Sequence, residues 1–256
     1  MLLNCHGLTM RFGGVVALDG LDLRLNAGEI LGLIGPNGSG KTTFFNTLTG
    51  LYTPSAGVIQ LAEKNITAAS PQTIFRAGVA RTFQRSRLCL PLSVFDNIAI
   101  GNHDHQRKSL WSTLLSRRAL ANEVREQFDV AYALLQRFNP MLSEKLDQPV
   151  SSLSMIDRRR VEICRALIGK PKLLLLDEPS AGMTFDETRT LMDDLLAEKS
   201  RSPSLSIILI EHEMSVIERI TQRCIVLNFG KKIAEGNYRE VARNAEVQAA
   251  YLGTQA

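Results

Sequence analysis

The chain has 256 residues, of which 45% are hydrophobic and 22% are charged, and its formal net charge is +4 at pH 7. These values are typical of a globular protein with a sizeable core, built as one large domain or two small ones. No apolar run approaches the ~18 residues of a membrane-spanning helix, and the first residues lack the pattern of a signal peptide. The composition therefore predicts a cytosolic globular protein.

The first hundred residues are predicted to form short strands around one helix. The segment 21–25 alternates apolar and polar residues, as a half-buried strand does. The continuous apolar segment 29–35 predicts a strand that is covered on both faces. A helix is expected from Lys41 to about Leu48, and 57–66 is expected to form a further strand and turn.

The middle of the chain changes to a helical pattern. Strand signals vanish there, so a helical subdomain is predicted at roughly 88–168. The apolar residues that recur at helical spacing are Trp111, Leu114, Leu115, Val124, Phe128, Ala131, Leu135 and Phe138.

After this region, apolar strands alternate with helices. Strands are expected at 172–178, 205–212 and 224–230, helices near 186–199 and 214–220, and a hairpin at 228–236. Alternation of this kind predicts a parallel sheet and therefore an α/β fold.

The segment GPNGSGKTT fits the P-loop pattern G-x-x-x-x-G-K-[ST] between an apolar strand and a helix, which disfavours a chance glycine-rich turn. Its glycines let backbone N–H groups face the phosphates of a nucleotide, and the helix N-terminus adds its dipole. The lysine supplies charge to the β- and γ-phosphates, and the following threonine hydroxyl can bind Mg²⁺. The candidate nucleotide-binding residues are Gly35, Asn37, Gly38, Ser39, Gly40, Lys41, Thr42 and Thr43.

An acidic pair ends the apolar strand LLLLDE. Asp177 is expected to hold Mg²⁺, directly or through water, and Glu178 is placed to polarise the water that attacks ATP. The alternative is an acidic pair that caps the next helix, which the P-loop disfavours. A glutamate at this place favours ATP hydrolysis over ATP binding alone.

With these motifs in place, the chain resembles the ATP-binding subunits of ABC transporters over essentially its whole length. The resemblance implies that Phe12 stacks on adenine, that Gln84 links Mg²⁺ to the membrane subunits, and that His212 holds the γ-phosphate and the attacking water. It also implies a P-loop ABC cassette with a mixed, mainly parallel core sheet, N-terminal antiparallel strands and a helical subdomain.

The same resemblance implies a single ABC ATPase domain over residues 1–256. The RecA-like core is expected at 1–87 and 169–236, with the helical subdomain at 88–168 inserted into it. The last segment, 237–256, is expected to form a C-terminal helical tail.

Within the family, the segments GVARTFQ, LSVFDNIAIG, IEHEM and AYLG are similar to those of the subunit that powers uptake of branched-chain amino acids in bacteria. The loop HDHQRKSLW fits the same branch. This resemblance implies integral membrane permease subunits as partners, a periplasmic or extracellular binding protein as an indirect partner, and no nucleic acid. The chain would act peripherally at the cytoplasmic face of the inner (plasma) membrane.

The fragment LSMID takes the place of the family signature LSGGQ, which meets the γ-phosphate of the ATP held by a partner cassette. Ser154 keeps the family residue. Met155 and Ile156 replace glycines where the backbone must approach phosphate, and Asp157 places negative charge beside a polyanion. This surface is therefore expected to bind the partner's ATP poorly, although Arg158 could partly neutralise Asp157.

The loop SAGMTFDE also departs from the family, because Thr184 and Phe185 replace an acidic residue or asparagine followed by proline. A homodimer would then contain two impaired sites, whereas a heterodimer with a fully equipped second cassette would keep one. We expect the heterodimer. The alternatives are a mainly ATP-binding regulatory cassette and an ABC ATPase that acts outside transport.

The sequence also contains a histidine pair, a run of three arginines and four scattered cysteines. His103 and His105 would give a metal only two ligands where tetrahedral metals take three or four, so a metal site is not expected there. The arginines at 158–160 are expected to face solvent or a partner. No CxxC pair is present, which favours buried, reduced thiols over disulfides or zinc binding. The cysteines are Cys5, Cys89, Cys164 and Cys224.

Overall fold

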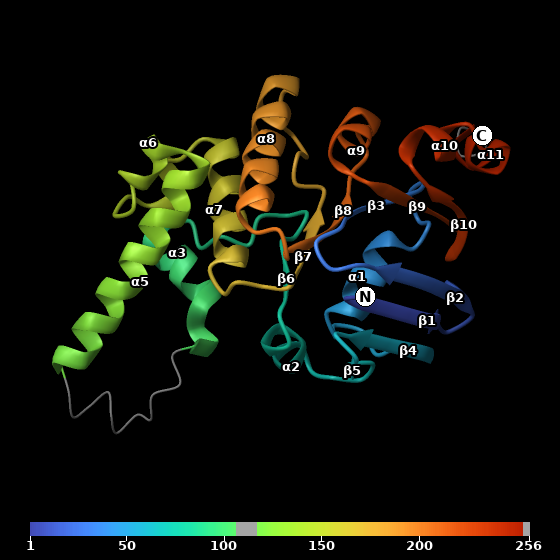
Figure 1. Cartoon of the computed structure of the whole chain (residues 1–256), viewed down its shortest axis with the longest axis horizontal. Helices are drawn as coiled ribbons and strands as arrows, with labels where there is room; N and C mark the ends of the chain where they lie inside the picture. Colours follow the sequence, from blue (N-terminus) through green and yellow to red (C-terminus); the bar gives the residue numbers. More distant parts are fainter. Residues whose placement is uncertain (106–116, 253–256) are drawn as a thin grey trace. The chain divides into compact units, whose positions relative to one another are not determined.

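The computed structural model describes residues 1–105 and 117–252, without the side chains of 103–105 and 117–120. The chain forms two compact units (Figure 1). Unit 1 contains Met1–Arg81, Lys172–Pro179 and Ser202–Ala256. Unit 2 contains Thr82–Pro171 and Ser180–Arg201.

Unit 1 contains an antiparallel sheet in the order β2-β1-β4-β5, in which β1, β2 and β4 lie side by side (Figure 1). Leu21, Leu23 and Leu25 of β2 are buried, whereas the residues between them are exposed, which confirms the half-buried strand. The strands are β1 (Leu3–Phe12), β2 (Val15–Leu25), β4 (Ala56–Leu61) and β5 (Lys64–Asn65).

The second sheet of unit 1 has the order β10-β9-β3-β8-β7-β6. All neighbouring strands are parallel except β9 and β10, which form the predicted hairpin. Every residue of β3, β7 and β8 is buried, as the continuous apolar segments predict. The strands are β3 (Ile30–Ile34), β6 (Val79–Arg81), β7 (Leu173–Asp177), β8 (Ser206–Ile210), β9 (Arg223–Asn228) and β10 (Lys231–Gly236).

The helices of unit 1 include α1, which spans the predicted residues Lys41–Leu48. The expectation of one helix in the first hundred residues is wrong, because α2 (Pro71–Arg76) of unit 1 and α3 (Val94–Ala99) of unit 2 also form there. Both have six residues, too few to show helical periodicity. The other helices of unit 1 are α2 (Pro71–Arg76), α9 (Met214–Ile220), α10 (Tyr238–Ala242) and α11 (Ala245–Leu252).

In the described residues of unit 2, every named element is a helix, and α5 packs against α7 (Figure 1). Ala131, Leu135 and Phe138 of α5 are buried as predicted, but Val124 is exposed. Trp111, Leu114 and Leu115 lie outside the described residues. The elements are α3 (Val94–Ala99), η1 (Ile100–His105), α5 (Arg117–Phe138), α6 (Pro140–Ser143), η2 (Val150–Ser152), α7 (Met155–Leu167) and α8 (Phe185–Arg201).

The cysteines are free thiols, and three of them, Cys5, Cys164 and Cys224, are buried. Burial raises the pKa of the Cys5 thiol to about 12, which keeps it in the unreactive protonated form. Cys89 is exposed, so the expectation of four buried thiols is wrong at this position.

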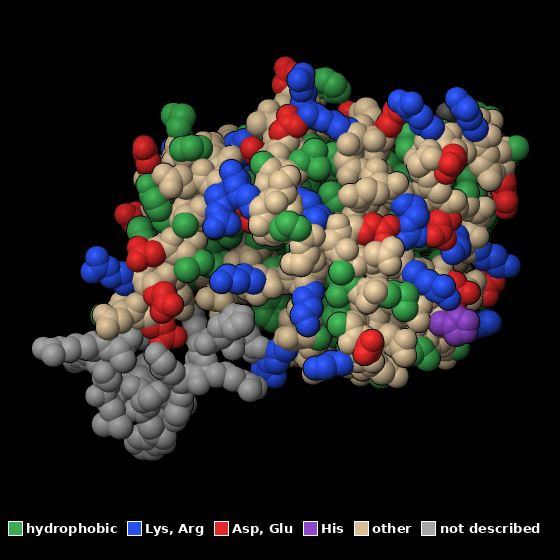
Figure 2. Space-filling model, viewed as in Figure 1, with side chains coloured by type: hydrophobic (Ala, Val, Ile, Leu, Met, Phe, Trp, Pro, Cys, Tyr) green, Lys and Arg blue, Asp and Glu red, His purple; other side chains and the backbone are tan. Residues whose placement is uncertain are grey.

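Charged side chains of both signs are interspersed over the face seen in Figure 2. None of the helices in the described ranges is long and apolar enough to cross a membrane. The side chains of the pair His103 and His105 lie outside the described residues, and the described part of the chain holds no group of three or more metal-ligating side chains.

Candidate nucleotide-binding and catalytic site

The P-loop connects β3 to α1, and its glycines are required by its geometry. Gly35 and Gly40 have φ values of 146° and 108°. A Cβ at Gly35 would lie 2.1 Å from the Leu227 carbonyl oxygen, and one at Gly40 would lie 2.6 Å from the Ala17 carbonyl oxygen. A Cβ at Gly38 would meet nothing within 4 Å, so the space beside this residue is open. The loop can therefore admit a phosphate group next to its backbone.

Lys41 lies within this loop and is only 7% exposed. Its Nζ donates hydrogen bonds to the carbonyl oxygens of Gly35 and Pro36, at 2.6 and 2.9 Å. Burial lowers the pKa of Lys41, while the nearby charges of Glu178 and Asp177 favour its protonated form. Because an ammonium group has three donors, Lys41 can exchange its carbonyl partners for phosphate oxygens.

The remaining P-loop side chains differ in exposure. The Ser39 hydroxyl is buried and makes no hydrogen bond to any described residue. Asn37 and Thr42 are exposed, and Thr43 is half-buried. An orphaned buried hydroxyl, open backbone and a buried ammonium together fit a phosphate group that satisfies them.

Asp177 ends β7 and forms a buried ion pair with Arg81, which ends the neighbouring strand β6. The Arg81 Nη2 lies 2.7 Å from the Asp177 Oδ2, and the two side chains are 5% and 4% exposed. Arg81 also donates to the Asn46 Oδ1 of α1 at 2.7 Å and lies over the Phe45 ring, 5.3 Å from its centroid. The guanidinium thus joins β6, β7 and the P-loop helix.

Glu178 and His212 meet at the carboxyl ends of β7 and β8. The His212 Nε2 lies 2.7 Å from the Glu178 Oε1, and the Glu178 N–H donates to the Ile210 carbonyl oxygen at 2.9 Å. The φ of Glu178 is 49°, a left-handed conformation that a non-glycine residue adopts only at an energetic cost. The glutamate is 15% exposed and the histidine 49% exposed, so water reaches the pair.

Phe12 lies at the end of β1 and is 43% exposed. Its ring makes an edge-to-face contact with Tyr52, with 5.2 Å between the centroids and 78° between the planes. The exposed part of the ring is large enough to offer a base a stacking partner.

Gln84 follows β6 and belongs to unit 2, where α7 holds its segment by the backbone. Arg159 donates to the carbonyl oxygens of Phe83 and Gln84, at 3.2 and 3.4 Å. Arg159 also pairs with Glu162 at 2.7 Å, and Glu162 accepts the N–H of Arg87 at 3.1 Å. The expectation that the arginines at 158–160 face outward is therefore wrong for Arg159, which is 7% exposed.

The LSMID fragment begins α7, with Ser154 as its N-cap. The Ser154 Oγ accepts the N–H of Asp157 at 3.3 Å. Asp157 pairs with Arg160 at 2.9 Å, and Arg160, also 7% exposed, pairs with Asp194 of α8 at 2.8 Å. The suggestion that Arg158 neutralises Asp157 is wrong, because Arg158 donates instead to the carbonyl oxygens of 150 and 151.

Two apolar side chains of unit 2 are exposed, one in the LSMID fragment and one in the SAGMTFDE segment. Met155 is 54% exposed and Phe185 is 66% exposed. The Met155 Sδ lies 3.4 Å from the place a Cβ of Gly182 would take, so the Met155 side chain lies beside this loop. Ile156 is half-buried. The start of α7 thus carries bulky side chains where two glycines would leave the backbone bare.

The candidate metal ligands suit Mg²⁺ chemically, since this ion prefers oxygen ligands such as those of carboxylate and hydroxyl groups. Asp177 and Thr42 are the candidates in unit 1, and Gln84 is the candidate in unit 2. Within the described residues, however, no three His, Cys, Asp or Glu side chains gather to hold a metal. A metal at Asp177 would therefore take further oxygens from phosphate and water.

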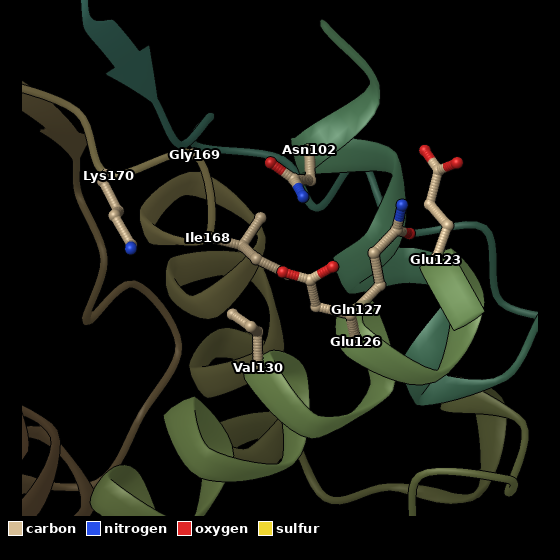
Figure 3. Close-up of a pocket in the computed structure, with 8 residues that line it drawn as sticks. All are labelled: Asn102, Glu123, Glu126, Gln127, Val130, Ile168, Gly169 and Lys170. Carbon is tan, nitrogen blue, oxygen red and sulfur yellow. The ribbon is translucent and has the colours of Figure 1, made fainter. Parts of the chain in front are cut away.

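Unit 2 also contains a pocket of about 440 Å³ that is separate from the P-loop residues (Figure 3). It lies between α5, the end of α7 and Asn102. Figure 3 shows the Glu126 side chain pointing toward Ile168. The pocket contains no candidate phosphate-binding residue, so it does not compete with the P-loop as the nucleotide site.

No motif in the sequence points to Arg81, Asn46 or Tyr52, and Arg160 is found there only as part of the arginine run 158–160. Arg81 and Asp177 are 96 residues apart, and no spacing pattern links them. The adjacency of β6 and β7 is the feature that brings them together.

Two family models match the chain. Residues 18–181 match the model described as ABC transporter. Residues 231–256 match the model described as branched-chain amino acid ATP-binding cassette transporter.

Curated relatives and solved structures agree with these models. The high-affinity branched-chain amino acid transport ATP-binding proteins LivG of Salmonella typhimurium and Escherichia coli are 41% and 40% identical to the chain, each over 98% of both sequences. BraF of Pseudomonas aeruginosa, with the same description, is 36% identical over the same shares. The crystal structure of a nucleotide-free ATP-binding cassette from an ABC transporter has a TM-score of 0.84 and 28% identity, covering 98% of each chain.

Proposed function

The chain belongs to the ATP-binding cassette family of ABC transporters and is an ATPase, and from this premise we propose that it powers the import of branched-chain amino acids or related polar solutes. The match of residues 231–256 to the branched-chain amino acid cassettes supports this cargo class. So do the relatives at 40–41% identity, which are named as transport proteins for these amino acids.

The contact between Glu178 and His212 is the observation that carries the hydrolytic role. In this proposal Glu178 polarises the attacking water, and His212 holds Glu178, the water and the γ-phosphate in place. Lys41 and the backbone of 35–43 bind the phosphates, and Phe12 stacks on adenine. Mg²⁺ bound with ATP would neutralise charge on the β- and γ-phosphates, and Thr42 and Asp177 of unit 1 would hold it. Gln84 is the further ligand that the family resemblance implies.

The chain is proposed to work in a dimer of cassettes at the cytoplasmic face of the membrane, bound to integral membrane permease subunits. We propose one ATPase domain with a helical subdomain, which the second compact unit supports. A periplasmic or extracellular binding protein would deliver the solute to the permease. The altered signature motivates the regulatory alternative, but the Glu178–His212 contact supports hydrolysis. The relatives named as transport proteins support a transporter over a non-transport ATPase.

The partner cassette is proposed to be a different chain. Met155 and the half-buried Ile156 take the places where a glycine pair would let the backbone approach phosphate. Asp157 is already paired with Arg160. A heterodimer would keep one competent site, formed by this chain's P-loop and the partner's signature.

Purification of the native complex from membranes tests this function. The chain should copurify with integral membrane subunits and a second cassette, and the complex in proteoliposomes should take up labelled leucine with ATP. The Glu178→Gln complex should assemble but show no ATP-dependent uptake. Uptake that is equal in both complexes would contradict the proposed role of this chain.

A further inference from the structure

Charged side chains of both signs gather at the end of β7. Asp177 and Glu178 are acidic, and Lys41 lies near enough for both to favour its charged form. Arg81 supplies the second cation, at 2.7 Å from Asp177. Asp177 is thus paired with Arg81, Glu178 contacts His212, and Lys41 lies within electrostatic reach of both carboxylates.

Arg81 is held firmly in this place. Its guanidinium bonds to Asp177 and Asn46, both at 2.7 Å, and lies against the ring of Phe45. Its side chain is 5% exposed. A buried guanidinium does not lose its proton in proteins, so its positive charge is permanent.

This fixed charge bears directly on metal binding. A divalent cation that approaches Asp177 meets a carboxylate whose Oδ2 is already engaged by a cation. Charges a few ångströms apart in a buried site are screened weakly, so the repulsion is substantial. Because the described residues offer few oxygen ligands near Asp177, a free cation gains little binding free energy at this site. The triphosphate of ATP changes the balance, because it brings several negative charges and oxygen ligands of its own.

We propose that Arg81 is a positioning residue that keeps Asp177 closed to free divalent cations and makes metal binding depend on bound nucleotide. Asp177 would then accept Mg²⁺ only together with ATP. This inference rests on the proposed nucleotide site, because Asp177 is the proposed metal ligand of that site and Arg81 controls when it binds metal.

Titration of the nucleotide-free chain with Mn²⁺, followed by the electron paramagnetic resonance signal of the free ion, tests the proposal. The parent should bind Mn²⁺ weakly. Arg81→Met and Arg81→Gln, which remove the charge, should bind it at least about tenfold more tightly, because a neighbouring opposite charge shifts carboxylate affinities for a proton by ~1–3 pKa units. Arg81→Lys keeps the charge and should behave as the parent does.

The double variant Arg81→Met/Asp177→Asn locates the new site. It should lose the gain, because the carboxylate that Arg81 shields is gone. A gain that persists in the double variant would overturn the proposal, as would unchanged Mn²⁺ affinity in both neutral variants with parental circular dichroism. Neutral variants that fold only with metal added would support it, since the metal then replaces the missing cation.

Binding of a fluorescent ATP analogue without metal separates this inference from the function on which it rests. A parent that binds no nucleotide, with or without Mg²⁺, would contradict the proposed nucleotide site. If the parent binds nucleotide but Arg81→Met shows no gain in Mn²⁺ affinity, only the proposed role of Arg81 is contradicted.

Discussion

The Glu178 Oε1 and the His212 Nε2 are 2.7 Å apart, although the two residues come from separate strands and lie 34 positions apart in the chain. Both residues follow buried parallel strands, β7 and β8, whose register brings Asp177 opposite Ile210. The pairing of these strands therefore brings the proposed base Glu178 close to His212. Such a contact orients the carboxylate toward one position rather than leaving it to rotate.

Glu178→Gln should retain ATP binding and lower the steady-state ATPase rate of the assembled complex by about 100-fold or more, since general-base catalysis contributes this much. Glutamine keeps the size and hydrogen bonding of the side chain but cannot take a proton from water. ATP affinity and phosphate release measure the two effects separately. Glu218→Gln, at a surface ion pair with Arg239, is the control and should leave both unchanged. Parental turnover in Glu178→Gln would remove this residue from its role.

Lys41→Ala should weaken binding of ATP with Mg²⁺ by about 10- to 100-fold, because a hydrogen bond to a charged group contributes ~1.5–3 kcal/mol. The Lys41 ammonium is buried and donates hydrogen bonds to the P-loop carbonyl oxygens of Gly35 and Pro36. Isothermal titration of the isolated chain measures the affinity. Lys64→Ala, on the exposed strand β5, serves as the matched control. Equal affinity in Lys41→Ala and the parent would refute the phosphate role of Lys41.

Residues 88–98 should contact the membrane subunit, since the family resemblance places the segment after Gln84 at that interface. Asn97 holds this segment in shape by accepting the Cys89 N–H at 2.8 Å and donating to the Cys89 carbonyl oxygen at 3.0 Å. Cys89 is exposed and can itself be used for cross-linking. With Cys89→Ser as the background, single cysteines at Leu90 and Leu92 should cross-link to the permease. A cysteine at Phe229, in the β9–β10 hairpin, should not, and cross-links from that hairpin alone would contradict the assignment.

Much of the fold could be predicted because its strands are long enough to show a pattern. The buried strands β3, β7 and β8 are continuous apolar runs, and α1 follows directly from the P-loop. Helices α2 and α3 depend on their N-caps, Ser70 and Ser93, which periodicity does not reveal.

The partners of charged residues were harder to predict. Arg159 and Arg160 belong to a run of three arginines that looks solvent-exposed in the sequence. In the fold, Arg159 binds the Gln84 segment and Arg160 binds Asp194, 34 residues away. Only the packing of α7 in unit 2 determines these pairs. The same limit hid the Arg81–Asp177 pair in unit 1.

The LSMID fragment gives the last prediction. The isolated chain should show little ATPase activity, because Met155 and Ile156 obstruct the surface that a second copy would offer to its ATP. A second cassette with an intact signature should restore hydrolysis at the site of Lys41 and Glu178. Steady-state phosphate release, with and without the partner cassette, measures this. Full activity of the unmodified chain alone would contradict the prediction.

Replacing Met155 and Ile156 by glycine, together with Asp157→Gln, should raise the activity of the isolated chain by at least about tenfold, because one preorganised donor to a reacting oxygen contributes about 100- to 1,000-fold. The glycine replacements should provide most of the gain, since Arg160 already neutralises Asp157 at 2.9 Å. Two glycines in the first turn of α7 destabilise it by ~1 kcal/mol each, so thermal melting must accompany the assay. Asp157→Gln alone is the matched control and should change activity little. A folded triple variant with no gain at saturating ATP and high protein concentration would show that bulk at the start of α7 is not what limits hydrolysis.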